Sequence, residues 1–170
     1  RGDWMQSNFK DALTTAPAEN GAVYRIANHG DQRDTAWALV SPLFDVPAGT
    51  EFAVVIKAGG TVPMDAPYSK REAATAVLWY GEDGRPVEIQ DVDGKMIPLA
   101  QPFGFRTVGE KRLKTVVKGR VPANARRAKI QIGGDAPDIR KDRYVDLESV
   151  QFRVREEQDD WDFGDCDAPE

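Results

Sequence analysis

Residues 121–154 read VPANARRAKIQIGGDAPDIRKDRYVDLESVQFRV and decide the fold class. Apolar and polar side chains alternate over residues 128–132 and again over residues 144–154, a period of two that is typical of strands with one face on a core. The intervening GGDAPDIRKDR is rich in Gly, Asp and Pro and continues neither strand. We therefore expect antiparallel β-structure, with Tyr144, Asp146, Glu148 and Val150 on one face of the second strand.

The rest of the chain carries further strand patterns. The most continuously apolar run is residues 52–58, FAVVIKA, which we expect to form a central strand. The pairs Asp83-Gly84 and Asp93-Gly94 predict tight turns. Shorter strands are predicted over residues 22–26, 36–40, 74–81, 87–89 and 112–120. Together these patterns predict an all-β fold, a two-sheet antiparallel β-sandwich with little helix.

At 170 residues the chain has the length of one domain, but its charge is unevenly divided. Residues 156–170 hold eight of the 28 acids and none of the 23 Lys and Arg, which leaves 20 acids against 23 bases in residues 1–155. We expect an N-terminal arm over residues 1–20, a β-sandwich domain over residues 21–155 and an acidic tail or linker over residues 156–170.

The scarcity of two residue types limits the chemistry. Cys166 is the only Cys, so the chain forms no intrachain disulfide and no Cys-based zinc site. His29 is the only His and belongs to no His cluster. No apolar run is long enough for a membrane span, and we expect no membrane insertion. The chain opens without Met or a signal peptide, which predicts a piece processed or excised from a longer protein.

Three segments carry a family resemblance: SPLFDVPAGTEF at residues 41–52, AVLWYGEDG at residues 76–84, and the stretch at residues 121–154. Their strands and turns resemble those of the galactose-binding-like jelly rolls, the β-sandwiches of many carbohydrate-binding modules. The resemblance implies a non-catalytic module of a larger exported protein, which would be secreted, periplasmic or held at the cell surface. It also implies a polysaccharide or other glycan, and neighbouring domains of the same chain, as partners.

The resemblance further implies a structural calcium ion. Asp146 matches the position of the family's late Asp ligand and is therefore our candidate metal ligand. The family's early Glu has no match, because the residue after Phe9 is Lys10. A calcium site at Asp146 thus depends on one matching carboxylate.

Aromatic and polar side chains in one strand and three loops are the candidate carbohydrate contacts. Because neighbouring residues of a strand alternate, one of Trp79 and Tyr80 faces the core and the other faces out; the sequence leaves open which ring would stack on a sugar. The loops at residues 28–34, 59–75 and 96–109 supply the other candidates. The full set is Trp79, Tyr80, Tyr68, His29, Arg33 and Arg106.

Basic residues recur along the predicted strand at residues 112–120. Alternation places Arg112, Lys114, Lys118 and Arg120 on one face. If this strand pairs with residues 127–131, Arg127 and Lys129 complete a stripe of six cations. Such a stripe would either bind an acidic glycan or serve only to keep the strand soluble and prevent it from pairing with other chains. Nucleic acid is disfavoured as a partner, because the tail is acidic and no recognised motif is present.

Three functions are consistent with the sequence. The first is a carbohydrate-binding module that holds a polysaccharide through an exposed aromatic ring and polar loops. The second is a ligand-free structural or interaction sandwich that packs against neighbouring domains of the same protein. The third is a small hydrolase or lyase using a carboxylate pair such as Asp135 with Asp138 or Asp142 with Asp146, and no flanking pattern marks either pair. We therefore expect no enzyme activity.

Overall fold

The computed structural model describes residues 5–7, 16–18, 21–27, 36–65, 75–135 and 143–155. Within these ranges every regular element is a β-strand, so the all-β prediction is confirmed. The strands are β1 (Met5–Ser7), β2 (Ala16–Ala18), β3 (Gly21–Ala27), β4 (Ala36–Val40), β5 (Phe44–Asp45), β6 (Glu51–Gly60), β7 (Ala76–Tyr80), β8 (Glu88–Gln90), β9 (Met96–Pro98), β10 (Ala100–Pro102), β11 (Gly109–Arg120), β12 (Arg127–Asp135) and β13 (Tyr144–Val154).

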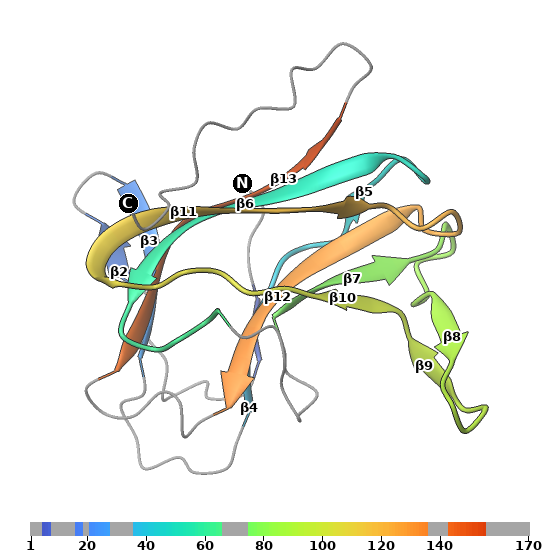
Figure 1. The fold of residues 1–170 in the computed structure, drawn as a ribbon, viewed down its shortest axis with the longest axis horizontal. Coiled ribbons are helices and arrows are strands. Elements are labelled where there is room, and N and C mark those ends of the chain that lie inside the picture. The colour runs from blue at the N-terminus through green and yellow to red at the C-terminus, as the bar shows by residue number, and fades with distance from the viewer. Residues whose placement is uncertain are drawn as a thin grey trace.

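The strands form two facing sheets and one projecting hairpin (Figure 1). The β12 sheet has the order β1-β4-β12-β7-β10, with β5 also paired to β12. The β6 sheet has the order β11-β6-β13-β3-β2, and β8 pairs with β9 as a separate hairpin. Every pair is antiparallel, and the predicted two-sheet sandwich is therefore confirmed.

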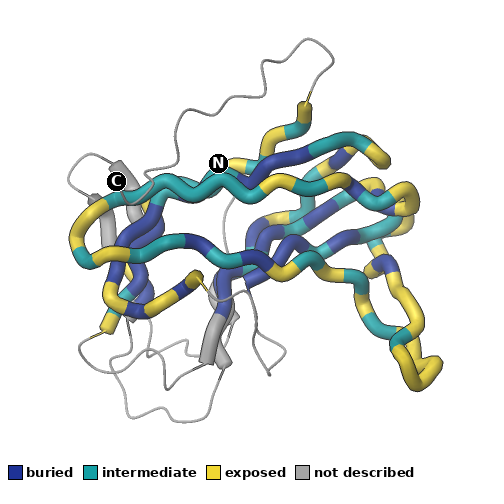
Figure 2. Tube along the Cα trace, in the orientation of Figure 1, coloured by how far each residue is buried: buried dark blue, intermediate teal, exposed yellow. Residues whose placement is uncertain are grey.

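The hydrophobic core lies between the two sheets. Phe52 of β6 stacks on Phe152 of β13, with ring centroids 5.0 Å apart, and meets the edge of Trp79 of β7 at 5.3 Å. The apolar positions predicted by alternation on β12, Ala128, Ile130 and Ile132, are buried opposite them. Figure 2 shows buried residues along the inner strands and exposed residues along the β8–β9 hairpin. Burying each large apolar side chain contributes about 1.5–3 kcal/mol.

A β-bulge in β13 corrects the predicted alternation of this strand. Leu147 pairs with Ala58 and Ser149 with Lys57, so β13 has one extra residue, Glu148, between two pairs that are consecutive on β6. An extra residue reverses which side chains face the core. Val150, which strict alternation placed with Asp146, therefore packs against the core, and that part of the prediction is wrong.

The last three strands, β11, β12 and β13, alternate between the two sheets. β12 pairs with β4, β5 and β7, whereas β13 pairs with β6 and β3, so these two strands lie in different sheets. β11 pairs with β6 and not with residues 127–131, which makes the predicted stripe of six cations wrong. Arg127 and Lys129 lie on the opposite sheet. Lys114, Lys118 and Arg120 do share one face of β11, as its register with β6 requires. Arg112 lies in the irregular start of β11 and contacts Asp146 on the same outer face.

Short strands before residue 21 join both sheets. Met5 pairs with Val40 of β4, and Ala16 pairs with Val23 of β3. The segment expected to be an N-terminal arm therefore supplies a strand at an edge of each sheet. The acidic segment at residues 156–170 lies outside the described residues. Among the described residues, no helix is long and apolar enough to cross a membrane.

Candidate functional site

The structure decides which ring of the Trp79-Tyr80 pair faces out. Trp79 is 2% exposed, because its ring lies between the sheets against Phe52. Tyr80 is half-buried on the outer face of the β12 sheet. The expectation that the two rings face opposite ways is confirmed. Trp79 as a sugar contact is wrong, because a ring in the core presents no face to a ligand.

Tyr80 is surrounded by polar and cationic side chains from β12. Arg127 lies in register with Tyr80, Lys129 with Leu78, and Gln131 with Ala76. The Nζ of Lys129 lies 5.3 Å from the centroid of the Tyr80 ring. We call the outward side chains of Leu78, Tyr80, Arg127, Lys129 and Gln131 the Tyr80 face.

On this face a neutral Tyr80 phenol lies beside the cationic hydrogen-bond donors Lys129 and Arg127. Partial burial raises the pKa of the Tyr80 phenol, so the hydroxyl stays protonated and able to donate throughout the neutral range. Lys129 is attracted by the ring's electron-rich face. The guanidinium of Arg127 is held by Asp45 of β5 through an Nε–Oδ1 contact of 3.3 Å. The face thus combines an apolar platform with hydrogen-bond donors of set position.

The β8–β9 hairpin stands at the end of the sheet where β7 finishes (Figure 1). Its root is tied to the sandwich, because Val87 N–H donates to the Trp79 carbonyl at 3.0 Å and Leu99 N–H to the Val87 carbonyl. The rest projects from the sandwich and exposes Ile89, Val92 and Met96, with Val92 fully exposed. An isolated two-stranded hairpin is only marginally stable in water.

The remaining predicted carbohydrate contacts do not join the Tyr80 face within the described residues. Arg106 belongs to the loop before β11, where its guanidinium donates to the Lys114 carbonyl at 3.1 Å and its backbone N–H to Thr115 Oγ1. It therefore fastens that loop to the edge of the β6 sheet. Tyr68, His29 and Arg33 lie outside the described residues, so their roles stay predictions.

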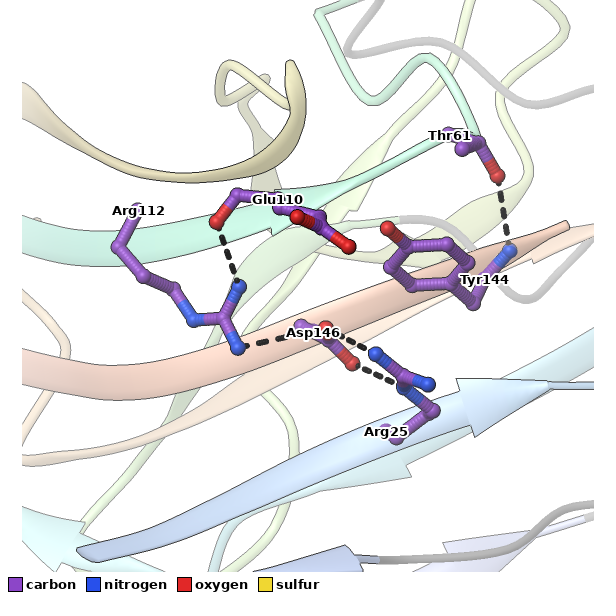
Figure 3. Close-up of polar contacts among 6 residues, drawn as sticks. All are labelled: Arg25, Thr61, Glu110, Arg112, Tyr144 and Asp146. Atoms are coloured by element: carbon purple, nitrogen blue, oxygen red, sulfur yellow. Dashed lines mark hydrogen bonds and ion pairs between the residues drawn. The ribbon is translucent and has the colours of Figure 1, made fainter. Parts of the chain in front are cut away.

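Asp146 is the centre of a charged cluster on the outer face of the β6 sheet (Figure 3). Its side chain is 1% exposed and accepts two hydrogen bonds from Arg25, each 2.8 Å long. Arg112 approaches the second carboxylate oxygen at 3.4 Å. The hydrogen bond to Asp146 is the main cause that raises the pKa of Arg25, whose guanidinium also lies 4.4 Å over the Tyr144 ring.

A glycine makes room for this cluster. Gly59 lies beside Asp146 on β6, and a Cβ there would come within 2.5 Å of the Lys111 carbonyl oxygen and 3.0 Å of Arg112 Nη1. The irregular start of β11 therefore lies close to β6 at Gly59, where Arg112 reaches Asp146. Sequence reasoning missed this cluster, because Arg25, Arg112 and Asp146 meet only through the pairing of three strands that are far apart in sequence.

The surroundings of Asp146 do not fit a calcium ion. Both carboxylate oxygens contact guanidinium groups, and two positive charges at this distance repel a divalent cation. Calcium takes six or more oxygen ligands, and the described part of the chain contains no group of three His, Cys, Asp or Glu able to hold a metal. The cluster accounts for the burial of Asp146 without a metal.

Comparison with known proteins supports the fold. No family model and no curated protein matches the chain. Among solved structures, it resembles the enzymatically active domain of tailspike protein 4 of bacteriophage CBA120, with 14% identity and a TM-score of 0.56. The match covers 89% of this chain but only 19% of the tailspike chain. At this identity the likeness shows a shared fold and nothing more.

Two looser matches cover nearly the whole of both chains. One is the K1 cleaved adhesin domain of Lys-gingipain from Porphyromonas gingivalis W83, with 14% identity, a TM-score of 0.38, and coverage of 90% of this chain and 91% of that one. The other is the CBM22-1 xylan-binding domain of Paenibacillus barcinonensis Xyn10C, with 11% identity, a TM-score of 0.34, and coverage of 90% and 95%. Superpositions this loose establish no shared function.

Proposed function

We propose that this chain is a non-catalytic carbohydrate-binding module of a larger exported protein, with the Tyr80 face as its binding surface. The observation that carries the proposal is the half-buried Tyr80 ring on an outer sheet face, with Lys129 5.3 Å from its centroid. An aromatic ring packs on the apolar face of a pyranose, while neighbouring donors bind its hydroxyl groups. Tyr80, Arg127, Lys129 and Gln131 supply both kinds of group on one surface.

The shape of this surface suits a polymer more than a small molecule. The Tyr80 face spans two adjacent strands, β7 and β12, and is continued by the exposed Ala100 of β10. Successive outward residues of a strand lie about 6.6–6.8 Å apart. A polysaccharide chain lying across the strands would therefore meet several of these side chains at once, and weak single contacts would add up.

The wider proposal is a galactose-binding-like module located outside the cytoplasm. A secreted, periplasmic or cell-surface position is what the resemblance to carbohydrate-binding modules of exported proteins implies. Because the chain spans 19% of the tailspike chain, that domain's enzymatic activity is not carried over. Calcium is left out of the binding step, because the surroundings of Asp146 do not fit it.

A glycan array tests the proposal. The wild-type chain, a Tyr80→Ala variant and a Tyr144→Ala variant would be applied to neutral and acidic polysaccharides, with calcium and again with chelator. Tyr144 is the matched control, since it is a half-buried tyrosine on the outer face of the opposite sheet. We expect wild type and Tyr144→Ala to bind one polysaccharide class and Tyr80→Ala to lose it, with or without chelator. Silence from a folded wild type would refute the proposal.

The projecting hairpin favours a second function, that of an interaction domain. Ile89, Val92 and Met96 are 42%, 101% and 49% exposed on an element that is fixed only at its root. Exposed apolar side chains gathered on one element mark contact surfaces, here for a neighbouring domain of the same protein. In the parent protein, Val92→Asp together with Met96→Asp would then split one cooperative unfolding transition into two. An unchanged single transition would remove this function.

A further inference from the structure

Four cations surround the start of β6 on the outer face of the β6 sheet. Ala53 of β6 lies between Lys118 of β11 and Arg153 of β13 in the register of the three strands. One step along, Glu51 contacts Arg120 on one side at 3.4 Å and Arg155 on the other at 2.7 Å. We call Lys118, Arg120, Arg153 and Arg155 the basic patch.

The basic patch has a strong local excess of positive charge. Four cations face one carboxylate, a local net charge of +3, in a chain whose formal net charge is −5. Arg155, followed by Arg120 and Lys118, lowers the pKa of Glu51. Glu51 therefore stays ionised and holds two of the guanidiniums in place without neutralising the patch.

The side chains of the patch are accessible. Arg120 is 65% exposed and Arg155 45% exposed, and Lys118 and Arg153 are also exposed. Each has a partner within the chain. Exposed ion pairs contribute little, so one anion replaces another at small cost. An incoming polyanion would gain the multiple donors of three guanidiniums in one step.

The geometry points to an anionic polysaccharide as the ligand: we infer that the basic patch binds a glycan bearing carboxylate or sulfate groups. Ala53 is small and fully buried, so no β6 side chain stands between Lys118 of β11 and Arg153 of β13. A polymer with carboxylate or sulfate groups along its length would contact cations on both sides of β6 at once. No aromatic side chain of β6, β11 or β13 faces outward within the patch, and single-stranded nucleic acid binding relies on such rings.

This site is separate from the Tyr80 face, which lies on the opposite sheet. The two proposals therefore fail independently. If only Tyr80→Ala loses binding, the glycan binds at the Tyr80 face. If only the basic-patch variant loses binding, the glycan binds at the basic patch.

The inference is tested by measuring the affinity of the full chain for acidic polysaccharides by calorimetric titration. The ligands are polygalacturonate and chondroitin sulfate, and uncharged dextran is the control. The variant is Lys118→Gln with Arg153→Gln. The matched control is Lys95→Gln with Arg85→Gln, which removes the same charge from exposed positions at the hairpin. We expect the patch variant to bind about tenfold or more weakly and the control to match wild type, with wild-type affinity falling as salt rises.

Three results would overturn the inference. One is absence of binding to both acidic polymers by a folded wild type at low salt. Another is an equal loss in patch and control variants, which would reduce the effect to net charge. The last is tighter binding to a DNA duplex or to anionic lipid vesicles than to either polysaccharide, which would assign the patch to another class of partner.

Discussion

Replacing Asp146 by Asn removes the charge at the centre of the Arg25–Asp146–Arg112 cluster while keeping the side-chain shape. The carboxylate is 1% exposed and accepts two hydrogen bonds of 2.8 Å from Arg25. A hydrogen bond to a charged group contributes about 1.5–3 kcal/mol, and removing one partner of a fully buried ion pair costs about 3–5 kcal/mol. Here the guanidiniums of Arg25 and Arg112 are 46% and 26% exposed, so water recovers part of the loss.

We therefore expect Asp146→Asn to lower the free energy of unfolding by about 2–3 kcal/mol. The assay is urea unfolding of a double-mutant cycle that combines Asp146→Asn with Arg25→Met. The control cycle uses Lys57 and Glu148, an exposed pair at 3.3 Å on the same sheet face. We expect a coupling energy of about 1.5–2 kcal/mol for the buried pair and below about 0.5 kcal/mol for the exposed one. Equal coupling in both cycles would refute the reasoning from burial.

Three further predictions concern the buried Trp79, the close contact between β6 and β11 at Gly59, and the ionisation of Tyr80. Trp79→Ala should cost about 3–5 kcal/mol in urea unfolding, because it empties the space against Phe52; a loss below about 1 kcal/mol would contradict the core position. Gly59→Ala should cost about 1–3 kcal/mol, because its Cβ displaces the Lys111 carbonyl; an unchanged midpoint would be inconsistent with that contact. Because the folded pKa of Tyr80 is raised, its stabilising contribution is present below pH 10 and is lost as pH rises through the folded value; Tyr80→Phe should weaken this alkaline dependence, and identical pH profiles would count against the burial of the phenol.

The strands and most of their faces followed from the sequence, because alternation is local. The faces of β11 and β12 were readable from the period of two, and the central position of β6 from its continuous apolar run. Residues 52–58 lie within a strand with a neighbour on each side, and the Asp93-Gly94 turn closes the β8–β9 hairpin. These features depend on residues within a few positions of one another.

Pairing between strands could not be predicted in the same way. The placement of Arg127 and Lys129 beside β11 was wrong, because register and sheet membership depend on contacts far apart in sequence. The bulge at Leu147 and Ser149 changes the facing of Val150 without any local signal such as Gly. For the same reason the partners of Asp146 were missed: Arg25 is 121 residues away along the chain.

The candidate site was predicted in part. The alternation narrowed the exposed ring to Trp79 or Tyr80, and burial in the structure selected Tyr80. Its neighbours Arg127 and Lys129 had been assigned to a different surface. The chemistry of the site therefore came from tertiary pairing between β7 and β12.

The most direct test of the account is the location of bound glycan, measured by amide chemical-shift changes during titration with an oligosaccharide of the class that binds on the array. The account predicts that the largest changes fall on residues 78–80 and 127–131, the strands of the Tyr80 face, and that Tyr80→Ala abolishes them. Changes confined to the β6 sheet or to the loops, with residues 78–80 unaffected, would contradict the central claim.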